Sequence, residues 1–123
     1  MAVYFTLMST KTFAILTDIH SNLAALEQGI SIIEKRKGVD QLVCLGDCFA
    51  LGPAPKETLN ILKGLDNCIF IRGNHDRYLI EKLWEQEQPS LEGMDPYDPI
   101  CQAIVANEEW TAAQLGQEGV DFA

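Results

Sequence analysis

Three short polar segments hold most of the side chains in this sequence that could carry out chemistry. They are Asp18-Ile19-His20, Gly46-Asp47 and Gly73-Asn74-His75-Asp76. Carboxylate oxygens, imidazole nitrogens and a carboxamide oxygen are suitable ligands for divalent metals such as Mn, Fe, Zn or Mg. Two such ions about 3.5 to 4 Å apart can clamp a phosphate group and lower the pKa of a bound water until it attacks phosphorus. The residue types therefore favour a metal site that acts on phosphate.

An apolar run precedes each of these polar segments. The runs are Phe13–Thr17, Gln41–Leu45 and Cys68–Ile71. They are too short for helices and rich in apolar residues, so each predicts a buried strand, and the third suits a strand buried on both faces. Each polar segment then lies where a strand ends and a turn begins.

Helices are predicted between and after the strands. The first begins near Ser21 or Asn22, both good N-caps, and Leu23, Leu26, Ile30 and Ile33 share one face. Others are expected from about Pro55, over residues 77–88, over residues 100–107, and from a capping-box pattern at Thr111-Ala112-Ala113-Gln114. The sequence thus predicts a single, C-terminally incomplete domain over residues 1–123, with a core at 12–88 and a helical segment at 99–123.

The order strand, helix, strand, helix, strand predicts an α/β fold with a parallel βαβαβ core and right-handed crossovers. Asp47 follows Asp18 after 29 residues and Asn74 follows Asp47 after 27, each about one βαβ unit. In such a sheet the carboxyl ends of successive strands lie side by side. We therefore expect Asp18, His20, Asp47, Asn74 and His75 to converge on one edge of the sheet.

In type, order and spacing, these segments match the D-x-H, G-D and G-N-H-D/E signature of the calcineurin-like metallophosphoesterases. The chain resembles their small bacterial and archaeal members of the YfcE-like and diadenosine-tetraphosphatase-like kinds. Further matching residues are 18–26, Leu45-Gly46-Asp47 with Gly52-Pro53, and Trp110-Thr111 with Gln114-Leu115. The resemblance covers nearly all of residues 12–118.

The resemblance implies a metal-dependent phosphoesterase with two divalent ions. It implies that Asp18 and His20 bind the first metal, that Asp47 bridges, and that Asn74 binds the second metal and the substrate. Its substrate would be a phosphorylated small molecule, a nucleotide or a phosphoprotein, and the sequence does not choose among them.

The remaining site residues lie in the third segment or directly before it. The resemblance implies that His75 contacts the phosphate and assists the leaving oxygen as general acid. Asp76 would orient His75 or cap the next helix, and both readings stay open. Arg72 is a candidate phosphate contact, with a surface charge as the alternative.

The chain departs from the family pattern at its C-terminal end. Family members continue with a second half that supplies a further His and a G-H-x-H motif, which completes an α/β/β/α sandwich. Here no His follows His75, so the second metal site keeps only Asp47 and Asn74. We expect an N-terminal half-sandwich in which the missing second sheet leaves apolar strand faces and an edge exposed, which promotes oligomerisation or poor solubility. A non-catalytic metal-binding or regulatory module is the alternative to an active hydrolase.

Composition narrows the range of partners. Nine basic residues against eighteen acidic ones give a formal charge of −9, which argues against a grip on nucleic acid phosphates. We expect no membrane span and no signal peptide, and hence a cytoplasmic protein whose start is Met1 or Met8. The four cysteines have no C-x-x-C spacing and predict reduced, buried thiols.

Overall fold

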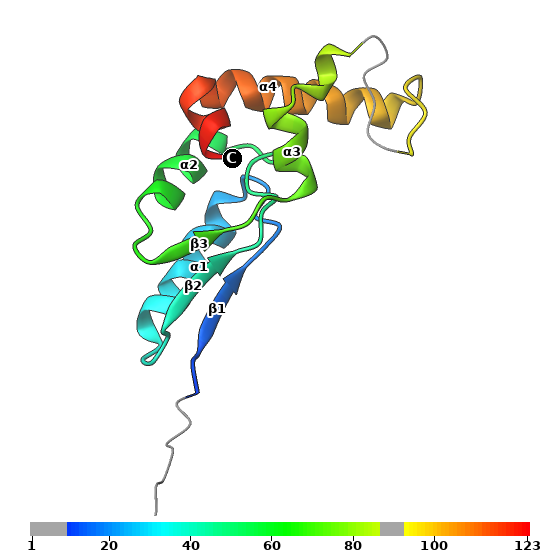
Figure 1. Ribbon diagram of the computed structural model, residues 1–123. Coiled ribbons are helices and arrows are strands. Elements are labelled where there is room, and N and C mark those ends of the chain that lie inside the picture. The colour runs from blue at the N-terminus through cyan, green and yellow to red at the C-terminus, as the bar shows by residue number, and fades with distance from the viewer. Residues whose placement is uncertain (1–9, 87–92) are drawn as a thin grey trace, which may run out of the picture.

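The computed structural model describes residues 10–86 and 93–123 (Figure 1). Its elements in chain order are β1 (Phe13–Leu16), α1 (Leu23–Lys35), β2 (Gln41–Cys44), α2 (Pro55–Lys63), β3 (Cys68–Phe70), α3 (Asn74–Ile80), the 3₁₀ helix η1 (Leu83–Glu85) and α4 (Pro99–Phe122). The predicted strands and the first two helices are thus present with small changes at their ends. The start at Met1 or Met8 lies outside the described residues.

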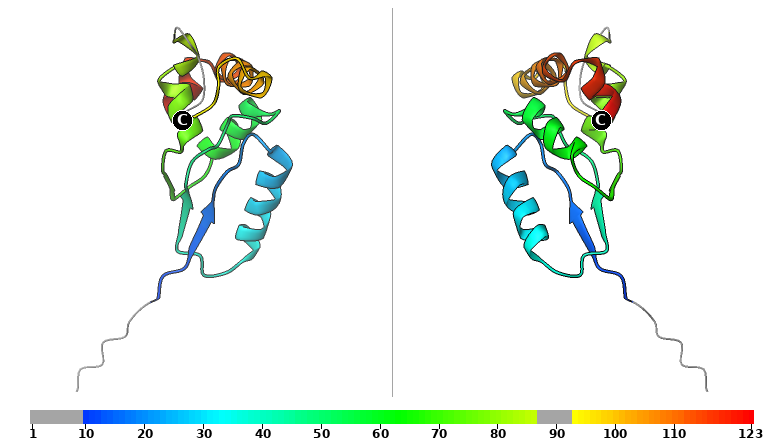
Figure 2. Two further views of the ribbon diagram at one scale, coloured as in Figure 1. Left: turned by 90° about the vertical axis from the view of Figure 1, so that its right-hand side faces the viewer. Right: turned by 90° about the vertical axis from the view of Figure 1, so that its left-hand side faces the viewer.

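The three strands form one parallel sheet in the order β1-β2-β3. Ala14 pairs with Leu42, and Leu42 in turn pairs with Cys68, so the strands run side by side without offset. Two consecutive right-handed crossovers place α1 and α2 on the same face of such a sheet. Figure 2 shows α1 along one side of the sheet, and α4 lies across its carboxyl end.

Local sequence explains where the first two helices begin. The side chain of Asn22 accepts a hydrogen bond from the backbone N–H of Ala25 at 3.2 Å, which satisfies one free donor of the first turn of α1. Pro55 stands in the first turn of α2, where its missing N–H costs no hydrogen bond. Both helix starts were predicted from these residue types.

The helices after β3 differ from the prediction. The predicted helix over residues 77–88 instead begins at Asn74 and ends at Ile80, because Lys82 adopts a left-handed conformation with φ +48°. The predicted break between residues 107 and 111 is also wrong. Residue Thr111 lies inside the continuous helix α4, buried, rather than at an N-cap, and the backbone departs from helical angles only at Gly116.

The core lies between the helices and one face of the sheet. Its buried members include Leu26 of α1, Leu62 of α2, Leu79 of α3 and Leu115 of α4, and Cys44 of β2 joins them. Each element therefore contributes apolar surface to one common core, which fixes the carboxyl ends of the strands beneath α3 and α4.

The other sheet face is exposed, contrary to the prediction that the third strand is buried on both faces. Side chains alternate along a strand, and the register places Ile15, Val43 and Ile69 in one row on the face opposite α1 and α2. Ile15 is 59% exposed and Ile69 51%. Within residues 10–86 and 93–123, no element covers this face, which we call the open sheet face.

All four cysteines carry free thiols. Cys44, Cys48 and Cys101 are buried as predicted, and Cys68 is half-buried. No helix in the described ranges combines the length and the apolar character that crossing a lipid bilayer requires.

Candidate metal centre

Backbone hydrogen bonds join the loops that follow β1 and β2. The N–H groups of Asp18 and His20 donate to the carbonyls of Gly46 and Asp47, at 3.3 and 2.9 Å, and the N–H of Ser21 donates to Cys48 at 2.8 Å. The parallel ladder thus continues beyond the strands into the polar segments. This continuation holds the first two polar segments against each other, as the strand order predicts.

Three of the predicted ligands come together at this point. Asp18, His20 and Asp47 each offer a donor atom, and these atoms all lie within 4.8 Å of one another. Nε2 of His20 lies 3.8 Å from Oδ1 of Asp18. The expectation that the two carboxylates share one edge of the sheet is therefore met, since both lie on the same side of the strand ends.

The imidazole of His20 is oriented by a backbone carbonyl. Its Nδ1 lies 3.0 Å from the carbonyl oxygen of Ala50, and a carbonyl can only accept, so Nδ1 carries the proton and donates it. This bond leaves Nε2 as the ring nitrogen with a free lone pair. Metal-binding histidines commonly donate their second ring N–H to such a carbonyl, which fixes the tautomer and the ring orientation.

Left-handed backbone conformations concentrate at the ligand-bearing loops. Asp18, His20, Ser21 and Asp47 have φ values between +45° and +54° although none of them is glycine. Such conformations are uncommon for residues with a Cβ and persist where the surrounding structure enforces them. Ser21 is fully buried, and its hydroxyl donates a hydrogen bond to the carbonyl of Phe49.

Asp76 ties the second and third polar segments together. Its carboxylate accepts hydrogen bonds from the backbone N–H groups of Asp47 at 2.8 Å, Gly73 at 2.9 Å and Cys48 at 3.2 Å. The bond to Gly73 caps the start of α3, so the capping role that the sequence offered for Asp76 is present. Its other two hydrogen bonds go to the loop of Asp47 rather than to the ring of His75, so Asp76 positions a candidate ligand.

The start of α3 is held against the same site. The backbone N–H of His75 donates to Oδ1 of Asp47 at 2.9 Å. The rings of His75 and His20 meet edge to face, with centroids 5.3 Å apart. Asn74 is the first residue of α3 and is exposed. The structure therefore places the His75 imidazole beside the group formed by Asp18, His20 and Asp47.

A carboxylate that the sequence did not predict completes the surroundings of His75. Glu108 of α4 is fully buried, and its Oε1 forms a hydrogen bond with Nδ1 of His75. This bond to Glu108 raises the pKa of His75, while loss of hydration on burial raises the pKa of Glu108. Glu108 lies 33 residues after His75, and the next residue is also a glutamate, the exposed Glu109. No local sequence pattern therefore distinguishes Glu108 as a partner of His75.

Two glycines allow the backbones of the polar segments to approach each other. A Cβ on Gly73 would lie 2.1 Å from Oδ1 of Asp47, and one on Gly46 would lie 2.2 Å from the nitrogen of Gly73. Real Cβ atoms do not come this close to other atoms, so both positions require glycine for steric reasons. Gly46 also has φ +97°.

Arg72 lies in the wall of a small cavity beside the loop of Asp47. It is exposed, and with Asp76, Phe70 and Phe122 it lines a cavity of about 180 Å³ between the end of β3 and the end of α4. The phenyl rings of Phe70 and Phe122 meet edge to face at 5.1 Å in the wall of this cavity.

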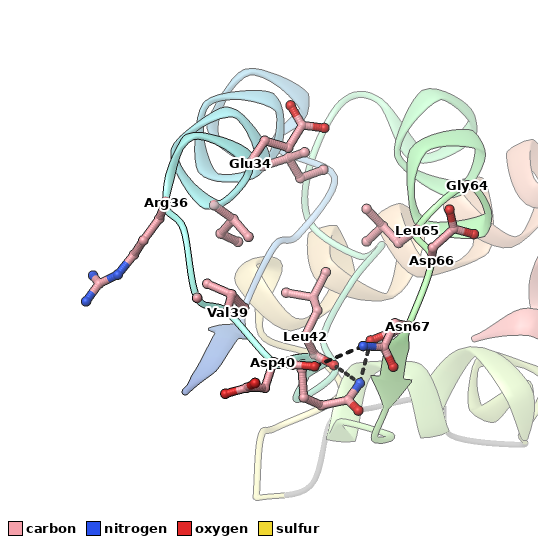
Figure 3. A pocket seen from close by; sticks show the side chains of 13 residues that line it. Glu34, Arg36, Val39, Asp40, Leu42, Gly64, Leu65, Asp66 and Asn67 are labelled. Atoms are coloured by element: carbon pink, nitrogen blue, oxygen red, sulfur yellow. Dashed lines mark hydrogen bonds between the residues drawn. The ribbon is translucent and has the colours of Figure 1, made fainter. Parts of the chain in front are cut away.

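A larger cavity of about 390 Å³ lies at the opposite end of the sheet (Figure 3). It opens between the ends of α1 and α2, above the start of β2. Leu42 and Leu65 point into it, while Arg36 points away. None of the candidate metal ligands lines this cavity, so the cavity is not part of the candidate metal centre.

The donor set fits a divalent cation. Two carboxylates and one imidazole are ligands that Mn, Fe or Zn accept. Two ligand atoms that each lie about 2.0 to 2.2 Å from one ion are at most roughly 4.4 Å apart. The donor atoms of Asp18, His20 and Asp47 all lie within 4.8 Å of one another, so a small movement of the side chains is enough for all three to bind one ion. The residues present are therefore suited to hold one ion, with the tautomer of His20 already set.

Solved structures share the fold of this chain. A metallophosphoesterase from Sphaerobacter thermophilus superimposes with a TM-score of 0.59 and 27% sequence identity, over 93% of this chain and 40% of that one. The hypothetical protein PH1004 from Pyrococcus horikoshii OT3 gives a TM-score of 0.67 and 26% identity, over 92% of this chain and 46% of that one. The α/β fold corresponds to the N-terminal half of the metallophosphoesterase fold.

Curated relatives agree with the structural comparison. The uncharacterized protein MJ0912 of Methanocaldococcus jannaschii is 33% identical over 115 residues, which are 94% of this chain and 42% of that protein. A symmetrical bis(5'-nucleosyl)-tetraphosphatase of Psychromonas ingrahamii is 34% identical over 67 residues, 54% of this chain and 24% of that enzyme. The chain thus spans less than half the length of these relatives. The family model for the calcineurin-like phosphoesterases matches residues 11–114, and the chain belongs to that family.

Proposed function

We propose that this chain binds a divalent metal ion through Asp18, His20 and Asp47 and hydrolyses a phosphate ester there. The observation that carries the proposal is the meeting of these three donors within 4.8 Å at the carboxyl ends of β1 and β2. Membership of the phosphoesterase family supplies the reaction class. A divalent ion at such a site supplies charge to polarise a phosphate and lowers the pKa of an attacking water.

The chain's own residues would divide the remaining work. Asn74 would offer its carbonyl oxygen to a second ion and donate its amide NH₂ to the substrate phosphate, and Asp47 would bridge the two ions. Support for this dinuclear arrangement is the position of Asn74 at the start of α3, one residue before the backbone N–H of His75 that donates to Asp47. His75 would contact the phosphate and give a proton to the leaving oxygen, which its place beside His20 supports. Arg72 would attract the phosphate from the rim, and Asp76 would hold Asp47 in position.

The substrate we propose is a phosphorylated small molecule, with nucleotides as the first class to test. The support is the similarity to a symmetrical bis(5'-nucleosyl)-tetraphosphatase over 67 residues. A negative charge of −9 on the protein makes cations at the site necessary to hold a polyanionic substrate. Phosphoproteins remain the second class to test.

The test is phosphate release from a generic phosphate ester and from dinucleotide polyphosphates, measured with added Mn²⁺. Activity that depends on Mn²⁺ and is lost in Asp47→Asn supports the proposal, because this change removes a carboxylate from the candidate site. Asp66→Asn, an exposed position, is the control for the loss of one negative charge. Equal activity in the wild type and Asp47→Asn would contradict the assignment.

A metal-binding or regulatory module without turnover is the second candidate. It would use the same three donors, Asp18, His20 and Asp47, to bind an ion, and it differs from the first candidate in releasing no phosphate. Isothermal titration with Mn²⁺ separates the two candidates. Binding that Asp47→Asn abolishes, with no phosphate release from any ester, would support the module.

Two further expectations accompany the proposed function. Oligomerisation through the edge of the sheet stays an expectation, and association through the open sheet face has the support that Ile15 and Ile69 on it are more than half exposed. A cytoplasmic location is supported by the free thiols of all four cysteines, since reducing compartments keep thiols in this form.

A further inference from the structure

Glu108 is a carboxylate placed where carboxylates are rarely found. It lies on α4, is fully buried, and one of its oxygens bonds to Nδ1 of His75. The other oxygen, Oε2, is buried without a hydrogen-bond partner among the described residues. Burying a carboxylate that is only half satisfied costs free energy, so a packing role alone would be served better by an apolar side chain.

The nearby aspartates do not engage the ring of His75 in this way. Asp76 accepts from three backbone N–H groups, and Asp47 accepts from the backbone N–H of His75. The bond to Nδ1 of the imidazole comes from Glu108, which reaches it from a helix that packs against α3. This contact joins α4 to the first turn of α3.

We propose that Glu108 is a positioning residue that keeps a proton on Nδ1 of His75, so that Nε2 is the ring nitrogen presented to the substrate. In the imidazolium form Nε2 carries the second proton and gives it to the leaving oxygen, which leaves the neutral ring with its proton on Nδ1. A carboxylate accepts and does not donate, and it therefore selects the imidazole tautomer that donates from Nδ1. His20 shows the same selection by a carbonyl, that of Ala50. This inference rests on the proposed function for its catalytic consequence, whereas the tautomer itself can be measured without any reaction.

The primary test is nitrogen-15 NMR of the histidine rings in the full chain without metal, at a pH where both rings are neutral. With two histidines in the sequence, the spectrum of His75→Asn assigns both rings. We expect His75 in the wild type to carry its proton on Nδ1. Glu108→Leu, which fills the space but cannot accept, should move the proton to Nε2, and Glu108→Gln, which can accept, should keep it on Nδ1. His20 should remain unchanged in all variants.

Two controls keep the test decisive. Glu109→Gln removes the same charge from the exposed neighbouring position and should leave the His75 signals unchanged. If Glu108→Leu does not fold, the Nδ1 proton signal of Glu108→Gln decides, because a proton shared with a carboxylate resonates further downfield than one bonded to an amide. A wild-type His75 protonated on Nε2, or the same Nδ1 signals in the wild type and every Glu108 variant, would overturn the inference.

Kinetics add a separate readout when phosphate release is observed. Glu108→Leu should lower kcat by roughly tenfold to a hundredfold with a smaller change in KM, and Glu108→Gln should recover most of kcat. A purely structural role would lower the melting temperature without this recovery. If neither the wild type nor any variant releases phosphate, the proposed function fails, while the NMR result still decides the role of Glu108.

Discussion

The carboxylate of Asp76 and the backbone N–H of Asp47 are joined by a hydrogen bond of 2.8 Å. This bond links the first turn of α3 to the loop that follows β2, 29 residues earlier in the chain. The same carboxylate also accepts from Cys48 and Gly73, and it is 2% exposed. A buried acceptor for three backbone donors therefore fixes the position of Asp47 before any metal is considered.

Asp76→Asn should destabilise both the fold and the site. The amide places an NH₂ group where an oxygen now accepts, so at least one buried backbone N–H loses its partner, at a cost of about 1 to 3 kcal/mol. We expect the free energy of unfolding in urea to fall by that amount and the affinity for Mn²⁺ to fall with it. Asp66→Asn, an exposed aspartate, is the control. Unchanged urea midpoints for Asp76→Asn would contradict this account.

Gly73→Ala should be far more damaging than Gly64→Ala. The φ values of the two glycines, −88° and −85°, are both open to residues with a Cβ, so a positive φ does not account for the difference. A Cβ on Gly73 would lie 2.1 Å from Asp47, whereas one on Gly64 would lie 3.4 Å from the nearest atom. We expect Gly73→Ala to cost about 3 kcal/mol of unfolding free energy and Gly64→Ala to change it by less than about 1 kcal/mol. Equal melting temperatures for the two variants would refute the close approach.

Divalent metal should stabilise the wild type. Binding to the folded state adds about 2.7 kcal/mol to the free energy of unfolding when the free ion is at a hundred times Kd. We therefore expect Mn²⁺ to raise the melting temperature and EDTA to reverse the rise. Asp18→Asn and His20→Ala should abolish it, since each removes a donor from the candidate site. A rise of the same size in both variants would place the bound ion elsewhere.

The open sheet face should drive self-association. Ile15 and Ile69 share one row of the sheet with Val43, and apolar rows of this kind are buried in most folded proteins. We expect the apparent mass in light scattering to rise with protein concentration, and the double variant Ile15→Thr with Ile69→Thr to remain monomeric. Ile32→Thr is the matched control, because Ile32 is 57% exposed but lies on α1. A wild type that stays monomeric at every concentration would count against this prediction.

The part of the fold that could be read from the sequence is the part governed by short-range patterns. The runs Phe13–Thr17 and Gln41–Leu45 showed strands, and Asn22 and Pro55 marked helix starts. The spacing of one βαβ unit then placed Asp18 and Asp47 on one edge of the sheet. Local pattern and chain topology were sufficient for these because neither depends on distant packing.

What the sequence could not show depends on contacts between distant residues. Glu108 meets His75 only because α4 crosses the end of the sheet, and nothing separates it from Glu109 in the sequence. The Thr111 pattern misled because a buried Thr in the middle of α4 has the same local sequence as an N-cap. The exposure of Ile69 depends on which layers cover the sheet, and an apolar run contains no information on that.

Because the backbone is left-handed at Asp18, His20, Ser21 and Asp47, the geometry of the candidate site depends on the stability of the whole fold. Conformations of this kind cost of order 1 to 3 kcal/mol each, and here loop hydrogen bonds and core packing restrain them. We expect these turns to relax first under mild denaturant, so that any affinity for Mn²⁺ at the candidate site is lost while helical circular dichroism is still intact. Loss of cation binding would then report disturbance of the native structure earlier than loss of secondary structure does.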